Sequence, residues 1–177
     1  QAAFFRERER PVCAVVVGTS KVEKNWTPEG YARVLEALEE DFGMQPVLVG
    51  GPSPVERAIA DETLALTRAR TVVDTLGNDL RRVMWILDGA HLTLSPDTGP
   101  LHISRALETP VVGLYGYTNP KRTGPWRRYQ DLVVDGYAEF AGEAYPISPE
   151  YRDGMKRVTV ERVLEKVALA RERYPEG

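Results

Sequence analysis

The 177-residue sequence has a single cysteine, Cys13, and only two histidines. One thiol can form no internal disulfide bond, and its position in an apolar, strand-like run indicates a reducing compartment. Zinc sites need several Cys, His or carboxylate ligands placed close together. Because one cysteine and two well-separated histidines supply no such cluster, the sequence predicts no bound metal.

The sequence also lacks long apolar runs and an excess of positive charge. No run reaches the roughly 18 apolar residues that a membrane-spanning helix needs, and no signal peptide is visible at residue 1. Lys and Arg number 23 against 26 Asp and Glu, a formal net charge of -3. Duplex-binding proteins usually carry a clustered basic surface, so no nucleic-acid partner is expected.

Short apolar runs alternate along the chain with stretches of helical spacing. The runs are rich in β-branched residues, which predicts buried parallel strands. We expect strands at residues 12–17, 47–49, 71–73, 91–94, 109–115 and 132–134. Strands that alternate with helices form right-handed βαβ units. The predicted fold class is therefore α/β, a Rossmann-like open parallel sheet with helices on both faces.

Residues 12–177 are expected to form one domain that includes a C-terminal helix starting after Thr159. Residues 1–11 contain the charged segment QAAFFRERER, which indicates a linker from a preceding N-terminal domain that this chain lacks. Residues 135–158 show no clear periodicity and are predicted to be loop.

Three helix starts carry capping signals. Thr27 and Pro28 are a typical N-cap and first helical residue. The segment from Ser53 to Glu56 has the form of a capping box, in which Glu56 bonds the backbone of Ser53. Asn78 is predicted to cap the following helix.

The segment 92–107 reads as a strand, a tight turn and a helix, and the turn carries Asp97, Thr98 and Gly99. Such a turn directs backbone N–H groups and the positive end of a helix dipole beyond the strand, where an anion such as phosphate binds. His102 lies in the same helical turn and can donate to a phosphate or a sugar hydroxyl. The alternative is that Asp97 and Thr98 only cap the helix and that His102 is partly buried and already bonded.

The loops 18–26, 50–56, 95–102 and 116–128 all follow predicted strands. In an open parallel sheet these loops meet at the carboxyl edge, where ligands bind. Their convergence predicts a binding site there.

Two of these loops offer further ligand-binding groups. Thr19, Ser20 and Lys24 combine two hydroxyls with an ammonium, which suits a diphosphate, although a solvated loop has the same composition. Glu56 beside two glycines can accept hydrogen bonds from ribose hydroxyls, the alternative to its capping role.

The loop 116–128 concentrates basic side chains, namely Lys121, Arg122, Arg127 and Arg128. We expect these four to be solvated surface rather than substrate contacts. Trp26 and Trp126 are expected to pack in the fold rather than to stack on a ligand.

Three motifs together resemble the signature of glycosyltransferase family 9, which contains the lipopolysaccharide heptosyltransferases. They read SPDTGPLHISRA at residues 95–106, PVVGLYGYTNP at 110–120 and GP at 124–125. The segment KNWTPE at residues 24–29 is similar to the family's Lys-x-Trp-Pro element. Members have a GT-B fold, two Rossmann-like domains facing each other across a cleft. This chain resembles the C-terminal one, which holds the nucleotide-sugar donor, over roughly residues 12–170.

The resemblance implies a donor site of nine residues. Asp97, Thr98, Gly99 and His102 would contact the diphosphate and donor sugar, Thr19, Ser20 and Lys24 the phosphates, Glu56 the ribose and Leu76 the base.

The resemblance also implies an activity: inverting transfer of heptose from ADP-heptose to a lipopolysaccharide core acceptor, without metal or other cofactor. The family's catalytic base belongs to the N-terminal domain, so no catalytic residue is expected here. Lys24 and His102 would only support the departure of the diphosphate. The expected location is the cytoplasm, including the inner face of the inner membrane as a peripheral protein.

Two alternatives remain open at the level of sequence. One is another GT-B nucleotide-sugar enzyme, such as a UDP-sugar transferase or epimerase. The other is a non-catalytic nucleotide-binding module. An NAD-dependent dehydrogenase is disfavoured, because no Gly-x-Gly-x-x-Gly follows residues 12–17.

Overall fold

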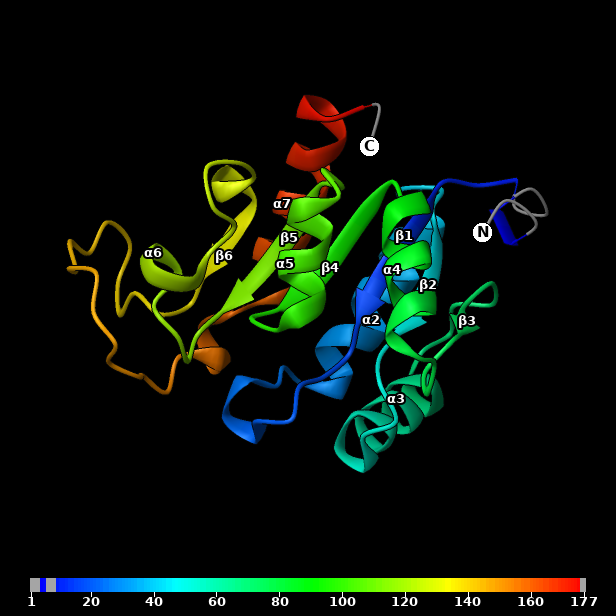
Figure 1. The fold of residues 1–177 in the computed structure, drawn as a ribbon, viewed down its shortest axis with the longest axis horizontal. Helices are drawn as coiled ribbons and strands as arrows, with labels where there is room; N and C mark the ends of the chain where they lie inside the picture. Colours follow the sequence, from blue (N-terminus) through cyan, green and yellow to red (C-terminus); the bar gives the residue numbers. More distant parts are fainter. Residues whose placement is uncertain (1–3, 6–8, 176–177) are drawn as a thin grey trace.

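A computed structural model describes residues 4–5 and 9–175 of the chain and contains a six-stranded, all-parallel sheet (Figure 1). The strand order is β3-β2-β1-β4-β5-β6. The strands are β1 (Val12–Val16), β2 (Gln45–Val49), β3 (Val73–Asp74), β4 (Leu92–Pro96), β5 (Val111–Tyr115) and β6 (Val133–Asp135). This topology confirms the predicted fold class.

Helices cover both faces of the sheet. They are α2 (Pro28–Glu40), α3 (Pro54–Leu66), α4 (Leu80–Gly89), α5 (Gly99–Ala106), α6 (Pro120–Thr123) and α7 (Val160–Arg173). Short 3-10 turns are η1 (Val22–Lys24), η2 (Gln130–Leu132) and η3 (Met155–Arg157). In Figure 1, α4 and α5 lie in front of the sheet, and α2 and α7 lie behind it.

The central strand β1 shows why both faces need a cover. All five of its residues are buried, and successive side chains point to opposite faces. Cys13 and Val15 join the cluster formed with α2 and α7, whereas Val12, Ala14 and Val16 join the cluster formed with α4. An apolar run of this kind is therefore stable only between two helical layers.

The carboxyl ends of the strands meet at one edge, the lower edge in Figure 1. Val16 pairs with Val49 across β1 and β2, and Pro96 pairs with Leu114 across β4 and β5. The loops after these four strands consequently lie at the same edge, as the sequence predicted.

Local capping predictions are only partly correct. Thr27 accepts a hydrogen bond from the Gly30 N–H at 3.1 Å, which confirms the predicted N-cap. Asn78 was the wrong cap for α4, because the side chain of Asp79 takes that role by accepting from the Arg82 N–H. The Asn78 amide instead donates to the carbonyl of Thr75 and closes the preceding turn.

Two other predicted segments need correction. The third strand lies at 73–74 rather than 71–73, since the Thr71 carbonyl is bound by the side chain of Gln45 instead of a neighbouring strand. The loop 116–128 contains the short helix α6, which begins after Asn119. Within 135–158 the only regular elements are the end of β6 and η3, in keeping with the predicted loop.

Replacing Gly30 by alanine is expected to lower the free energy of unfolding by about 1–3 kcal/mol. The new Cβ would lie 2.7 Å from Cζ2 of Trp26, a buried side chain whose indole donates to the Val158 carbonyl. Thermal or urea unfolding measures the loss. Gly99→Ala is the matched control, since a Cβ there meets no atom within 4 Å. Equal stability of both variants would contradict close packing at Gly30.

Candidate functional site

The centre of the candidate site is the carboxylate of Asp97, in the turn between β4 and α5. Its Oδ2 accepts hydrogen bonds from Lys24 Nζ at 2.9 Å, Thr118 Oγ1 at 2.6 Å and Thr123 Oγ1 at 3.3 Å. Its Oδ1 lies 3.5 Å from His102 Nε2. The side chain is only 7% exposed, so these donors replace the water that it loses. Asp97 therefore links the loops that follow β1, β4 and β5.

The contacts keep Asp97 ionised. Burial alone would raise the pKa of this carboxyl, but the hydrogen bonds from His102, Lys24 and Thr118 outweigh it and hold the pKa well below its usual range. Asp97 is thus a permanent anion at neutral pH and has little affinity for a proton. The alternative that Asp97 caps α5 is not supported, because its carboxylate accepts from the side chains of Lys24, Thr118 and Thr123 rather than from backbone N–H groups of α5.

Lys24 lies at the end of η1 and reaches across to the Asp97 turn. Its ammonium donates to the carbonyl oxygen of Asp97 at 3.0 Å as well as to Oδ2. An ammonium has three protons, so one donor remains for a ligand. With a side chain 19% exposed, Lys24 stands at the border between the protein and the site.

The start of α5 presents polar groups on an open surface. The hydroxyl of Thr98 makes no capping hydrogen bond, which leaves it for other partners. Gly99 is exposed with open space beside it. The side chain of His102 is 51% exposed and lies 3.5 Å from Asp97 Oδ1, so it is partly buried, as the structural alternative expects, and still accessible. The first turn of α5 is thus accessible to a molecule in the site.

Thr19 and Ser20 lie in the loop between β1 and η1, but they differ in their surroundings. Thr19 is 4% exposed, and its hydroxyl donates to the Lys21 carbonyl at 2.8 Å, which closes the loop. Ser20 is exposed at the surface. In this arrangement Thr19 fixes the loop that carries Lys24, and Ser20 has the freer hydroxyl.

Glu56 does not bond the backbone of Ser53, as a capping box would require. Ser53 makes no side-chain capping bond, and Glu56 Oε2 accepts from the Gly51 N–H at 2.8 Å. The capping-box prediction is therefore wrong, because the loop after β2 turns its own N–H toward the carboxylate. Glu56 lines a cavity of about 260 Å³ together with Gly18, Gly50, Gly51, Asn78 and Thr98.

Leu76 lies beside Gly50, on the same side as Glu56. A Cβ on Gly50 would lie 2.8 Å from Glu56 Oε2 and 3.1 Å from Cγ of Leu76. Leu76 also lines a neighbouring cavity of about 570 Å³ with Asn78 and Trp85. Asn78 borders both hollows, which places Leu76 beside the space that Glu56 faces.

The basic loop does not form a joint binding surface. Lys121 Nζ donates to the Tyr145 carbonyl, Arg128 pairs with Glu108, and Arg127 stacks on Trp126 at 4.0 Å. These contacts fit the expected surface role. Trp26 is buried as expected, whereas Trp126 is 66% exposed, so the prediction that Trp126 packs inside the fold is wrong.

Thr118 and Thr123 were not among the predicted site residues. Thr118 belongs to the motif PVVGLYGYTNP, but a threonine 21 residues after Asp97 carries no local signal of contact with it. The short helix α6 and the bridge between Thr118 and Tyr151 bring these hydroxyls into place. Only the tertiary fold identifies them.

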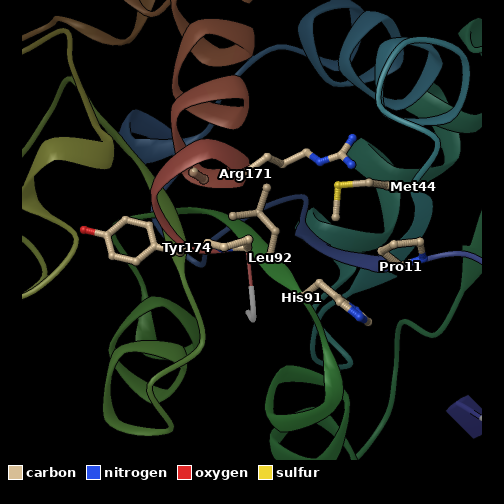
Figure 2. Close-up of a pocket in the computed structure, with 8 residues that line it drawn as sticks. Pro11, Met44, His91, Leu92, Arg171 and Tyr174 are labelled. Carbon is tan, nitrogen blue, oxygen red and sulfur yellow. The ribbon is translucent and has the colours of Figure 1, made fainter.

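A separate pocket of about 120 Å³ lies at the opposite edge of the sheet, among the amino ends of the strands (Figure 2). Pro11, Met44, His91 and Tyr174 are among its lining residues. His91 Nδ1 accepts from the Val12 N–H, and burial lowers the pKa of this imidazole. The histidine of this pocket is thus already bonded to the backbone of β1.

In residues 4–5 and 9–175, no three His, Cys, Asp or Glu side chains are grouped as they would be around a metal ion. The same part of the chain contains no helix with the length and apolar character needed to cross a membrane.

Sequence comparison assigns most of this chain to a family. Residues 1–141 match the model of glycosyltransferase family 9 (heptosyltransferase). The lipopolysaccharide core heptosyltransferase OpsX of Haemophilus influenzae is 34% identical over 127 residues, which are 72% of this chain and 36% of that protein. Lipopolysaccharide heptosyltransferase 1 of Pseudomonas aeruginosa is 34% identical over 120 residues. The chain thus spans about a third of the length of these relatives.

Solved structures show the same fold. The ADP-heptose lipopolysaccharide heptosyltransferase II of Escherichia coli superposes with a TM-score of 0.75 and 22% identity, over 96% of this chain and 50% of that one. The E. coli heptosyltransferase WaaC with ADP gives a TM-score of 0.69 and 21% identity, over 91% of this chain and 44% of that one. The fold is therefore one Rossmann-like half of a GT-B enzyme.

Proposed function

This chain belongs to glycosyltransferase family 9, and from that membership we propose that it is the donor-binding domain of an inverting heptosyltransferase. The proposed donor is ADP-heptose and the proposed acceptor is a sugar of the lipopolysaccharide core. Residues 1–11 act as the linker to the N-terminal domain, and residues 12–177 bind the donor. The observation that carries the proposal is the cluster of Asp97, Lys24 and His102 at the start of α5.

The cluster suits a diphosphate attached to a sugar. The N-terminus of α5 and the third proton of the Lys24 ammonium favour negative charge. The Asp97 carboxylate repels phosphate but accepts hydrogen bonds from sugar hydroxyls. We therefore place the phosphates beside Lys24, His102, Ser20 and the backbone of Thr98 and Gly99, with the sugar toward Asp97.

The nucleoside fits the neighbouring cavity. Glu56 lines this hollow, and its Oε1 makes no hydrogen bond within the described part of the chain, so it can accept from ribose hydroxyls. Leu76, beside Gly50, offers an apolar contact for the base. A nucleotide held in this way spans the ends of β1, β2 and β4.

As the sugar C–O bond breaks and the acceptor oxygen bonds to the same carbon, one additional negative charge develops on the departing diphosphate. Lys24 and His102 donate to that charge and the α5 dipole stabilises it, which lowers the barrier to breaking the sugar–phosphate bond. The proton of the acceptor hydroxyl goes to a carboxylate base that we place in the N-terminal domain. The proposed location is the cytoplasm, including the inner face of the inner membrane.

Replacing Lys24 or His102 by alanine is expected to weaken ADP binding to the isolated chain, by about tenfold for Lys24→Ala. The physical reason is the loss of one donor to the phosphates, which is charge-assisted in the case of the Lys24 ammonium. Isothermal calorimetry measures both variants against wild type. Lys166→Ala is the matched control, because it removes the same charge from α7, where Lys166 binds the Asp131 carbonyl.

Equal ADP affinities of wild type, Lys24→Ala and His102→Ala would overturn the proposal. The same titrations with UDP separate it from the first alternative. Tighter binding of UDP than of ADP would favour a UDP-sugar enzyme, and no binding of either would overturn the donor-binding proposal.

A further inference from the structure

The two carboxylate oxygens of Asp97 differ in the number of hydrogen-bond donors around them. Three donors, from Lys24, Thr118 and Thr123, converge on Oδ2 and use its accepting capacity. Among the described residues, Oδ1 faces one side-chain donor, the imidazole of His102, at the long distance of 3.5 Å. One oxygen is thus committed to the protein, and the other retains accepting capacity.

The loop after β5 holds the hydroxyls of Thr118 and Thr123 in place beside Asp97. Thr118 is 5% exposed, and its backbone forms an antiparallel bridge with Tyr151. The Asn119 amide donates to the Pro146 carbonyl, which ties the same segment to the following loop. The buried Tyr115 hydroxyl donates to the carbonyl of Thr123. Both threonines are therefore fixed from outside the site.

The Lys24 ammonium cannot fully neutralise both the Asp97 carboxylate and a diphosphate. As its ammonium turns toward phosphate, the buried carboxylate loses part of its counter-charge, and an uncompensated buried charge is strongly unfavourable. The hydroxyl of Thr118, at 2.6 Å, stays on Oδ2 whatever Lys24 does. A neutral donor of this kind stabilises the carboxylate without attracting the phosphates.

We propose that Thr118, supported by Thr123, is a positioning residue for the donor sugar. It holds Oδ2 of Asp97 so that Oδ1 faces a hydroxyl of the sugar and Lys24 is available to the diphosphate. This inference rests on the proposed function of the same site. The group that contacts the sugar is Asp97, and Thr118 acts through it.

The first test needs no ligand. Carbon-13 NMR of the Asp97 carboxyl follows its pKa in wild type, Thr118→Val and Thr118→Ser. Valine has the shape of threonine without the hydroxyl, so we expect the pKa to rise by about one unit, and serine to restore it. Thr123→Val is expected to give a smaller rise, because its hydroxyl lies farther away, at 3.3 Å. An unchanged pKa in both valine variants would overturn the proposal.

Other charged or titratable groups that face Asp97 stay constant in this comparison. They are Lys24 on η1, His102 on α5 and Tyr115 on β5, whose pKa is raised by burial and by the Asp97 charge itself. Thr109→Val is the control, since it removes another buried hydroxyl bond, to the Leu87 carbonyl. We expect this control to leave the Asp97 pKa unchanged.

The second test separates sugar from nucleotide. Thr118→Val is expected to weaken binding of ADP-heptose about tenfold and binding of ADP less than twofold. In an Asp97→Asn background the same substitution is expected to have no further effect on ADP-heptose. Equal losses for both ligands, or a full loss in the Asp97→Asn background, would overturn the positioning role. Failure of wild type to bind ADP would instead overturn the proposed function, while the ligand-free pKa measurement still stands.

Discussion

Asp97→Asn is expected to remove part of the pH dependence of stability on the acid side. The pKa of Asp97 is lowered in the folded protein, so the unfolded carboxylate takes up a proton at a higher pH than the folded one. The contribution of Asp97 is fully present above its unfolded pKa, about 3.9. It is lost as the pH falls from there toward the lower folded value. Asparagine does not titrate and lacks this contribution at every pH.

The expected loss of unfolding free energy is large for a single substitution. At pH 7 the variant should be less stable than wild type by about 2–3 kcal/mol, because an ionised, hydrogen-bonded carboxylate is lost. Urea unfolding at pH 7, 5, 4 and 3 measures the difference, which should narrow below pH 4. Asp61→Asn is a suitable control, since the Asp61 side chain is 67% exposed and pairs with Arg57 at the surface. A difference that is constant from pH 7 to pH 3 would contradict a lowered pKa.

The sheet was predictable because burial leaves a simple pattern. The run at 12–17 is apolar throughout and the run at 109–115 is mostly so, and β1 and β5 are buried on both faces. The edge strand β3 pairs with β2 over only two residues and includes the exposed Asp74. An edge strand of this kind has no continuous apolar run, so its position could not be read as accurately.

The errors at helix starts share one cause. Asn78 and Asp79 are both good N-caps, and the sequence does not say which of them the turn aims at the helix. Glu56 has the spacing of a capping box, but the glycine-rich loop after β2 presents the Gly51 N–H to it instead. Local sequence spacing predicts which donors and acceptors lie near a helix start. The tertiary path of the loop determines which of them form hydrogen bonds there.

In the candidate site, too, some contacts follow from the sequence pattern and others depend on the tertiary path of a loop. Parallel strands must bring Lys24, Asp97 and His102 to one edge, so their proximity follows from topology. The contact of Thr118 with Asp97 depends on α6, whose start signal is only Asn119 before Pro120, and on the bridge to Tyr151, which has no sequence signal. The sequence therefore predicted the charged members of the site and missed the hydroxyls that orient them.

The isolated chain is expected to bind ADP but to transfer no heptose. A general base needs a pKa near the working pH, and such a group commonly contributes about 10²–10⁴-fold to the rate. Asp97 fails this requirement because its hydrogen bonds hold its pKa far below neutrality. Glu56 accepts from the Gly51 N–H and lines the cavity that we propose for the nucleoside, where a base would face ribose rather than an acceptor. Neither carboxylate of this site is therefore placed to activate an acceptor hydroxyl.

Transfer from ADP-heptose to a lipopolysaccharide core acceptor, followed by ADP release, measures this directly. We expect no ADP above the uncatalysed background from the isolated chain, and at least about 10³-fold faster release when it is joined to the N-terminal domain of a family member. His102→Ala in the joined enzyme should lower kcat, while the isolated chain stays inactive. That result would show that a residue of this chain assists the departure of ADP. Transfer by the isolated chain would show that the base lies within these 177 residues, and Asp97→Asn in that chain would then identify whether Asp97 is the base despite its low pKa.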